Sequence, residues 1–380
     1  MRTNLILYSL YFLALALAAA MNSFANYQPT NDTLSSEDVP PVRNVSLMPL
    51  GSSCTGTILS VTEAGEVFAT NGNSGIVTCS KSGQKLAEFK GMGFVAMTAS
   101  GNAVVKNNNG DVREVSAIGE TIWQTQIPAP ATEGAISTDG YLYMISGGSV
   151  YAISSVHQIL WHWDSSTTYY TGMELRNMVL GSDGAVYVVS PAADVVALDR
   201  EGKRTWQIHP GSLLVSRPAA AAAGRVYISD TNNLVAIGPD GSILWRYRFP
   251  VNPLFLAGGA PTPVVAIDGD VYIARRSFFC IRQDGKERWR FHPDTADEYF
   301  IASPTLGSDG TIYLLSAATE RGRIYALSPD GAKKWSYVLA HNGYMDPPMR
   351  FGSDGSLLKA EGNGFLAFSV AKSKTGMATQ

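Results

Sequence analysis

A tryptophan recurs along this chain in one fixed context, as the fourth residue after a glycine that ends a polar turn. His157 takes the place of the glycine before one of these tryptophans, and Ala87 takes the place of the tryptophan after Gly83. Successive recurrences are about 36 to 46 residues apart, a spacing typical of propeller blades and helical repeats. The recurring residues are Trp123, Trp161, Trp206, Trp245, Trp289 and Trp335.

Each repeat also carries the signals of three further strands. Upstream of the tryptophan, a turn ending in glycine precedes alternating hydrophobic residues, as in Asp183-Gly184 before residues 186–188. This pattern predicts a hairpin, because glycine accepts the positive φ that tight turns require. A strand with a small residue between larger ones follows, for example residues 195–198, and then comes the tryptophan strand. Four strands joined by hairpins are typical of a propeller blade.

Counting the hairpins gives the number of blades. Only seven units have a fourth strand, because the chain ends soon after residues 365–368. The segment Val45 to Leu50 would supply the missing outer strand and remove an open sheet edge. We therefore predict an all-β fold, an eight-bladed β-propeller with four-stranded antiparallel blades closed by the N-terminal strand, with seven blades as the alternative. The eight hairpin glycines are Gly65, Gly101, Gly140, Gly184, Gly224, Gly269, Gly310 and Gly355.

One segment sets helix propensity against the repeat. Ala219 to Ala223 are five alanines followed by glycine, a composition that favours a helix on propensity alone. The repeat instead places them on the innermost strand of the fifth blade, where small side chains fit near the axis. We therefore expect these alanines to form a strand, as the repeat predicts, and not a helix.

The two ends of the chain lie outside the repeats. Residues 1–25 combine a positive start, an apolar run from Leu5 to Ala20 and small residues at positions 23 and 25, which predicts a cleaved signal peptide. Residues 26–44 read as a flexible leader, 45–370 as the propeller and 371–380 as a disordered tail. We expect an exported protein, periplasmic or secreted, with no transmembrane segment in the mature chain.

Net charge and cysteine spacing limit the classes of partner and ligand that we expect. A formal net charge of −3 gives no basic face, so we do not expect a nucleic-acid partner. The three cysteines, Cys54, Cys79 and Cys280, have no metal-binding spacing. Cys54 and Cys79 fall in one repeat and could bridge, but we favour small core residues. Cys280 stands in the small-residue position of its third strand, which also indicates packing.

The repeat resembles a known family. Residues 197–206, Ala-Leu-Asp-Arg-Glu-Gly-Lys-Arg-Thr-Trp, resemble the tryptophan-docking repeat of the pyrroloquinoline-quinone-like propeller superfamily, and residues 236–245 and 326–335 repeat it more loosely. The resemblance implies that the outer-strand tryptophans pack between adjacent blades, against the small residue and the turn. The superfamily includes quinone-dependent dehydrogenases and the non-catalytic propeller of the outer-membrane barrel-assembly machinery. The chain resembles the latter in size and blade count but lacks a lipidation cysteine, and it lacks the adjacent cysteine pair of the alcohol dehydrogenases.

Catalytic chemistry finds little support in the sequence. Most acidic residues stand in Asp-Gly turns, where turn chemistry accounts for them. His209 and His292 occupy equivalent places in two repeats, which indicates a structural role and no shared metal. We therefore expect no catalytic residue, no metal and no cofactor. Pyrroloquinoline quinone with calcium belongs only to the alternative reading as a quinone-dependent dehydrogenase or sugar-processing enzyme using the axial funnel.

The long connections between blades are the candidate partner-binding rim. Crossings from an outer to the next inner strand share one rim with the loops between second and third strands, and several are long. Loops on a rigid scaffold concentrate binding residues, and aromatic residues are enriched among interface anchors. The alternative is that these rings cap the blade ends. The candidate rim residues are Tyr169, Tyr170, Phe255, Asp297, Tyr299, Phe300, Tyr344 and Asp346.

A second candidate set begins the inner strands. A polar residue often stands seven positions before the hairpin glycine, where it could ring the mouth of the axial channel. Solvation of the pore and a ligand site both fit such a ring. The candidate funnel residues are Glu133, Arg176, Asn177, Arg217, Thr262 and Ser303. Together these features predict a monomeric, non-catalytic interaction or scaffold module that presents its long-loop rim to a protein or envelope partner.

Overall fold

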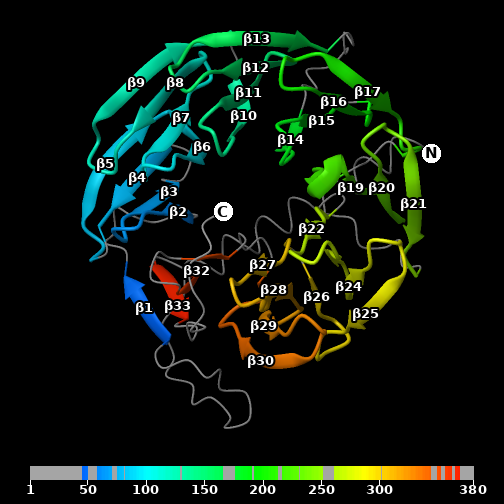
Figure 1. Ribbon diagram of the computed structural model, residues 1–380. Coiled ribbons are helices and arrows are strands. Elements are labelled where there is room, and N and C mark those ends of the chain that lie inside the picture. Colours follow the sequence, from blue (N-terminus) through cyan, green and yellow to red (C-terminus); the bar gives the residue numbers. More distant parts are fainter. Residues whose placement is uncertain are drawn as a thin grey trace, which may run out of the picture.

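Eight small sheets are arranged in a circle around a central axis (Figure 1). The structure is a computed structural model. It describes residues 45–49, 58–70, 75–80, 82–128, 131–165, 176–190, 192–212, 216–230, 232–250, 261–300, 302–343, 349–351, 356–361 and 364–368. The predicted signal peptide, leader and tail lie outside these residues. The eight-bladed propeller is confirmed, and the seven-bladed alternative is wrong.

The first four blades are antiparallel sheets that run in chain order from an inner to an outer strand. Blade 1 comprises β2 (Ile58–Val61), β3 (Val67–Thr70), β4 (Gly75–Cys79) and β5 (Lys85–Lys90). Blade 2 comprises β6 (Gly93–Met97), β7 (Ala103–Lys106), β8 (Asp111–Val115) and β9 (Thr121–Gln126). Blade 3 comprises β10 (Ala131–Ile136), β11 (Leu142–Ser146), β12 (Ser149–Ile153) and β13 (Ile159–Asp164). Blade 4 comprises β14 (Arg176–Leu180), β15 (Val186–Val189), β16 (Val195–Leu198) and β17 (Arg204–Ile208).

The next three blades keep this order with shorter inner strands. Blade 5 comprises β18 (Ala219–Ala220), β19 (Val226–Ser229), β20 (Asn233–Ile237) and β21 (Ile243–Arg248). Blade 6 comprises β22 (Val264–Val265), β23 (Val271–Ala274), β24 (Phe278–Ile281) and β25 (Glu287–Phe291). In blade 7, β26 (Tyr299–Phe300) and β27 (Thr305–Leu306) both pair with β28 (Ile312–Ala317), which precedes β29 (Arg323–Leu327) and β30 (Lys333–Val338).

Blade 8 closes the ring with both ends of the repeat region. Its order is β31 (Arg350–Phe351), β32 (Leu357–Glu361), β33 (Gly364–Phe368) and then β1 (Val45–Pro49). β1 pairs antiparallel with β33, with Val45 opposite Phe368 and Pro49 opposite Gly364. β31 of this blade also lies beside β2 of blade 1. The predicted closure by the N-terminal strand is confirmed.

A row of three side chains crosses each of blades 3 to 7 and fixes its packing. In blade 4, Tyr187 of β15 lies opposite Ala197, which lies opposite Trp206. The small alanine lets the two rings meet over it, with centroids 5.8 Å apart. Burial raises the pKa of Tyr187 to about 12. The equivalent rows are Tyr143–Ala152–Trp161, Tyr227–Ala236–Trp245, Tyr272–Cys280–Trp289 and Tyr313–Ala326–Trp335.

Two expectations need correction. Only Ala219 and Ala220 of the alanine run lie on the inner strand, because residues Ala222–Gly224 form a short 3-10 turn, η1. Ala223 there has a φ of 58°, in the left-handed region, so this turn replaces the Asp-Gly hairpin of other blades. Cys79 is disulfide-bonded, so an unpaired core thiol is wrong at this position. Cys280 is a free, buried thiol, and Cys54 lies outside the described residues.

Candidate functional site

The boundaries between blades 3 and 7 are held by indoles that hydrogen-bond to the turn of the following blade. Trp161 Nε1 donates to Arg200 O at 2.8 Å, and Gly202 of the same turn lies against the ring. A Cβ at Gly202 would stand 2.5 Å from Trp161 Cδ2, and its φ of 80° favours glycine. The same bond joins Trp206 Nε1 to Pro239 O (2.9 Å), Trp245 Nε1 to Gln283 O (2.8 Å) and Trp289 Nε1 to Pro329 O (3.0 Å).

Other boundaries are built differently. His157 stands in the glycine position with a φ of 67°, and its ring stacks on Trp123 with centroids 4.3 Å apart. Trp123 Nε1 donates to Glu114 Oε2 within its own blade at 2.5 Å. Between blades 1 and 2, Gly119 lies against Ala87. Between blades 7 and 8, Trp335 stacks on Phe368 with centroids 6.0 Å apart.

The predicted funnel residues bond to one another across blades. Glu133 on β10 accepts a hydrogen bond from Asn177 N of blade 4 at 2.8 Å and pairs with Arg217 of blade 5 at 2.6 Å. The Glu133 side chain is 18 % exposed, whereas that of Arg217 is 51 % exposed. Ser303 Oγ donates to Thr262 O at 3.2 Å. These contacts join the inner ends of blades 3, 4 and 5 and of blades 6 and 7, and they leave Arg217 partly open to solvent. Arg176 lies on β14, and its side chain is outside the described part of the chain.

The rim at blade 7 is held together by acidic side chains. Asp297 accepts hydrogen bonds from Thr319 N at 3.0 Å and from Thr295 Oγ1 at 2.8 Å, and these bonds lower the pKa of Asp297 to about 2. Glu298 is buried and accepts from Arg323, Tyr325 Oη and Ser316 Oγ. Both carboxylates therefore position the crossing against the next hairpin.

The predicted rim aromatics divide into separate groups. Phe300 is 5 % exposed and packs edge-on against Phe278 and Tyr325, so its expected place on the exposed rim is wrong. Its pairing with β28 turns the ring inward. Tyr299, the residue before it, is half-buried. The remaining members lie outside the described residues, namely Tyr169, Tyr170, Phe255, Tyr344 and Asp346.

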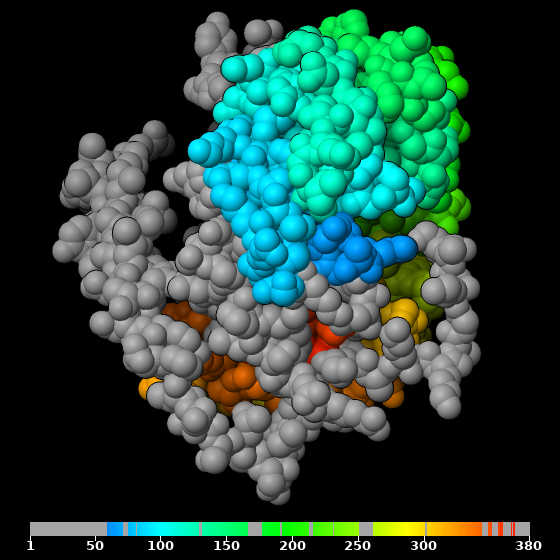
Figure 2. All heavy atoms as spheres, turned by 90° about the vertical axis from the view of Figure 1, so that its left-hand side faces the viewer, coloured from blue at the N-terminus to red at the C-terminus, as the bar shows by residue number. Residues whose placement is uncertain are grey.

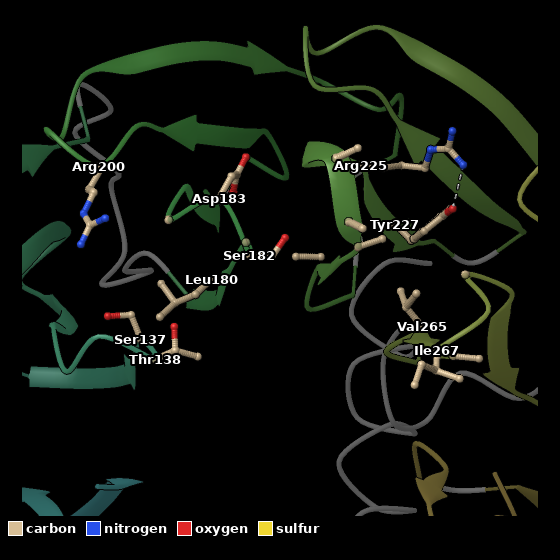
Figure 3. Close-up of a pocket in the computed structure, with 18 of the residues that line it drawn as sticks. Ser137, Thr138, Leu180, Ser182, Asp183, Arg200, Arg225, Tyr227, Val265 and Ile267 are labelled. Carbon is tan, nitrogen blue, oxygen red and sulfur yellow. Dashed lines mark hydrogen bonds between the residues drawn. The ribbon is translucent and has the colours of Figure 1, made fainter. Parts of the chain in front are cut away.

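A cavity of about 1000 Å³ opens at the opposite end of the axis, among the first hairpin turns of blades 3 to 6 (Figure 3). Ser182 and Leu180 face it from blade 4, and Val265 and Ile267 from blade 6. Arg200 and Asp139 form an ion pair between blades 4 and 3 at its border. Across the described residues, no three His, Cys, Asp or Glu side chains converge as a metal site would require.

The two equivalent histidines have structural partners. His209 Nδ1 lies 2.9 Å from Asp194 Oδ1, and His292 Nδ1 lies 3.0 Å from Ser277 Oγ. In both cases the partner directly precedes the third strand of the same blade. Each histidine therefore joins the segment after the fourth strand to the loop between the second and third strands of its blade.

Comparison with known families decides the relationship. The model of the family described as outer membrane protein assembly factor BamB matches residues 53–208 and 192–374. The chain belongs to this family. A search of curated proteins finds no match. Membership of this family supports a protein-interacting propeller at the family level, related to an assembly factor of the outer membrane.

Solved structures share the fold with this BamB-family chain. BamB from Moraxella catarrhalis is 14 % identical, with a TM-score of 0.58 over 86 % of this chain and 98 % of that one. A streptogramin B lyase is 15 % identical, with a TM-score of 0.52 over 73 % and 92 %. An inactive virginiamycin B lyase from Staphylococcus aureus with quinupristin is 12 % identical, with a TM-score of 0.52 over 73 % and 94 %. Identities this low show the fold alone.

Sequence reasoning missed one set of exposed residues on this BamB-family propeller. The fully aliphatic side chains at the turns and outer strands of blades 2 and 3 are solvent-exposed rather than packed. They stand on the rim of tight turns, opposite the long crossings. The signal for Ile118 and Val156 is a break in the repeat, because blades 4 to 7 carry an acidic residue at the same turn position. The strand residues Ile159 and Leu160 have exposed aliphatic counterparts in blade 5, Ile243 and Leu244. The residues are Ile118, Ile122, Val156, Ile159 and Leu160.

Proposed function

We propose that this protein is an exported, non-catalytic scaffold that binds a protein or envelope partner through its long-crossing rim. The observation that carries the proposal is the asymmetry of the ring. Crossings at 165–175, 249–263, 292–304 and 339–349 join outer to inner strands at one rim, whereas the turns of the other rim are tight. Long loops on a rigid frame are where binding residues concentrate.

Groups that remain accessible on this rim support the proposal. Arg217 keeps half of its side chain in solvent beside the anchored Glu133. Asp297 is exposed on a crossing that its own hydrogen bonds hold in place. A charged group fixed by its surroundings loses little conformational freedom when a partner binds, which favours affinity. Membership of a family of assembly factors fits the same role. Among the helices of the described residues, none has the length and hydropathy to cross a membrane.

Alanine substitution of Tyr169, Tyr170 and Tyr299 together tests the proposal. Immobilised wild-type and variant proteins are used to capture proteins from the exported fraction of the native cells. The proposal expects one or more captured bands to be lost from the triple variant and retained by Lys286→Ala, a control at an exposed turn of blade 6 on the opposite rim. Equal capture by all three proteins would contradict partner binding through the long-crossing rim.

A second candidate, a quinone-dependent dehydrogenase or sugar-processing enzyme, would use the axis of the ring, where the cavity opens. The described lining offers Asp183, Asp268 and Arg225 but no three-ligand cluster for calcium. The described residues therefore do not fit the calcium-bound quinone that this chemistry uses. A dye-linked oxidation assay with added calcium and pyrroloquinoline quinone discriminates the two candidates. Turnover that is lost in Asp183→Asn would favour the enzyme.

A further inference from the structure

Five aliphatic side chains form an exposed patch on the rim of tight turns, here called the blade 2–3 patch. Ile118, Ile122, Val156, Ile159 and Leu160 are 61 %, 52 %, 70 %, 45 % and 52 % exposed. Isolated surface hydrophobic residues are ordinary, but several together indicate an interaction site. β5 and β9, the outer strands of blades 1 and 2, lie on the left of Figure 1 and therefore on the side that faces the viewer in Figure 2, whereas β13 of blade 3 lies at the top.

The patch residues lie on both sides of one blade boundary. The rings of Trp123 and His157 stack across this boundary, with centroids 4.3 Å apart. Ile122 directly precedes Trp123, and Val156 directly precedes His157. Each of these two exposed aliphatic residues is therefore next in sequence to a ring that joins blades 2 and 3.

The fold itself does not require aliphatic residues at these places. The residue before the turn glycine is Ile118 in blade 2 and Val156 in blade 3, where His157 replaces the glycine. At the same position, blades 4 to 7 carry Glu201, Asp240, Asp284 and Asp330. The residue before the tryptophan is polar in blades 4, 6 and 7, but in blade 5 it is Leu244, which is 45 % exposed. The turn position therefore sets blades 2 and 3 apart: because acidic residues serve there in blades 4 to 7, the scaffold alone does not explain Ile118 and Val156.

The border of the patch is acidic on balance. Glu120 ends the turn that contains Ile118, and it is exposed. Glu201 lies in the turn of blade 4 to which Trp161, the residue after Leu160, bonds, and it is also exposed. Asp199 of that turn is a third carboxylate, whose hydrogen bonds come from neutral backbone N–H groups. Arg200 pairs with Asp139, and Lys203 is the cation of the same turn. Three carboxylates against one ammonium favour a partner of positive charge.

From these observations we infer that the blade 2–3 patch is a second docking surface, which binds a partner polypeptide segment whose aliphatic side chains are flanked by lysine or arginine. The aliphatic residues supply burial, and the two glutamates select the charge of the segment. The inference rests on the proposed function as an interaction module, but it uses the opposite rim and other residues.

Two fluorescent nine-residue peptides probe the patch, one alternating leucine with lysine and one alternating leucine with glutamate. Their anisotropy is measured against wild-type protein, Ile118→Asp/Val156→Asp and a control, Asp240→Asn, at the equivalent turn position of blade 5. We expect saturable binding of the lysine peptide, at least tenfold weaker binding to the patch variant and unchanged binding to the control. Wild-type protein should bind the glutamate peptide at least tenfold more weakly. Thermal unfolding confirms that the patch variant folds, since both positions are exposed.

Other results overturn the inference. Absence of saturable binding, or equal binding by the patch variant, would show that the patch is not a docking surface. Equal binding of both peptides would show that the surface does not select a basic partner. If sedimentation shows a dimer that the patch variant loses, the occupant is a second copy of the chain. Patch-dependent flotation with phosphatidylcholine and phosphatidylglycerol vesicles, without peptide binding, makes it a lipid surface. The triple variant of Tyr169, Tyr170 and Tyr299 should bind the lysine peptide normally, so the two proposals fail separately.

Discussion

The boundary between blades 2 and 3 and the boundary between blades 4 and 5 use the same two positions in opposite ways. At the second, Trp206 donates its indole N–H to Pro239 O and covers Gly241. At the first, Trp123 bonds inside its own blade to Glu114, and His157 covers its ring in place of a glycine. One boundary joins two blades by a hydrogen bond and the other by ring stacking.

The difference extends to the surface. The regular boundary carries Asp240 at the turn, where its carboxylate accepts bonds from Ser242. The irregular boundary carries Val156 at that place, with 70 % of the residue exposed. A repeat under structural constraint alone would keep the turn-capping acid. The departure from the repeat thus coincides with the exposed turn residues, and it is at this degenerate boundary that we propose a binding surface.

Replacing the two tryptophans should separate the boundaries most clearly. We expect Trp206→Ala to lower the free energy of unfolding by about 3 kcal/mol, because a large ring and an inter-blade hydrogen bond are lost. Trp123→Ala should cost less, since Glu114 keeps its bonds to Thr98 and Asn102. Urea unfolding followed by circular dichroism measures both. Equal losses would contradict the distinction between the boundaries.

The turn glycine should come next in size. A Cβ at Gly241 would stand 2.9 Å from Trp206 Cγ, and the φ of 82° is unfavourable for alanine. Gly241→Ala should therefore destabilise the protein by about 2 kcal/mol. Gly211, with a φ of 89° but no atom within 4 Å of the added Cβ, is the matched control for the backbone effect. A loss at Gly241 no greater than at Gly211 would show that contact with the indole is unimportant.

His157 offers a smaller and sharper test. His157→Ala should cost about 1 kcal/mol through the lost stacking on Trp123. His157→Gly loses the same stacking but relieves the left-handed strain of a φ of 67°, so it should be more stable than the alanine variant by about 1 kcal/mol. Thermal unfolding of the two variants checks the order. If alanine proves the more stable, the positive φ is not the constraint at this turn.

The fold could be predicted from the sequence because its signals are local and repeated. The glycine, the small residue and the tryptophan each recur at one place per blade, so an error in one unit is corrected by the others. The alanine run shows the limit of this reasoning. The repeat correctly placed Ala219 and Ala220 on a strand, but the turn geometry of Ala222–Gly224 has no counterpart in the other units.

The site residues were harder to predict because their environment depends on distant parts of the chain. Phe300 has an aromatic, loop-like sequence context, yet it is buried by Phe278 and Tyr325 of two different blades. Asp297 bonds to Thr319, which lies in the following hairpin. Ile118 and Val156 look like strand residues in sequence, and only the turn position of each shows that it is exposed. The exposure of a side chain depends on how neighbouring blades pack, and the sequence of a single repeat does not contain that information.

The smallest effect concerns acid and the turn before Trp245. Hydrogen bonds from Ser242 lower the pKa of Asp240 below its usual value. A carboxyl whose pKa is lowered by folding stabilises the protein above its unfolded pKa, and this contribution is lost as the pH falls through the folded value. Asp240→Val, which copies the residue of blade 3, should therefore be less stable than wild type at pH 7, and the difference should shrink below about pH 4. Urea unfolding at pH 7 and pH 3 measures it. A difference that stays constant between the two pH values would mean that the carboxylate does not stabilise this turn, and the exposed valine of blade 3 would then carry no cost that a binding role must offset.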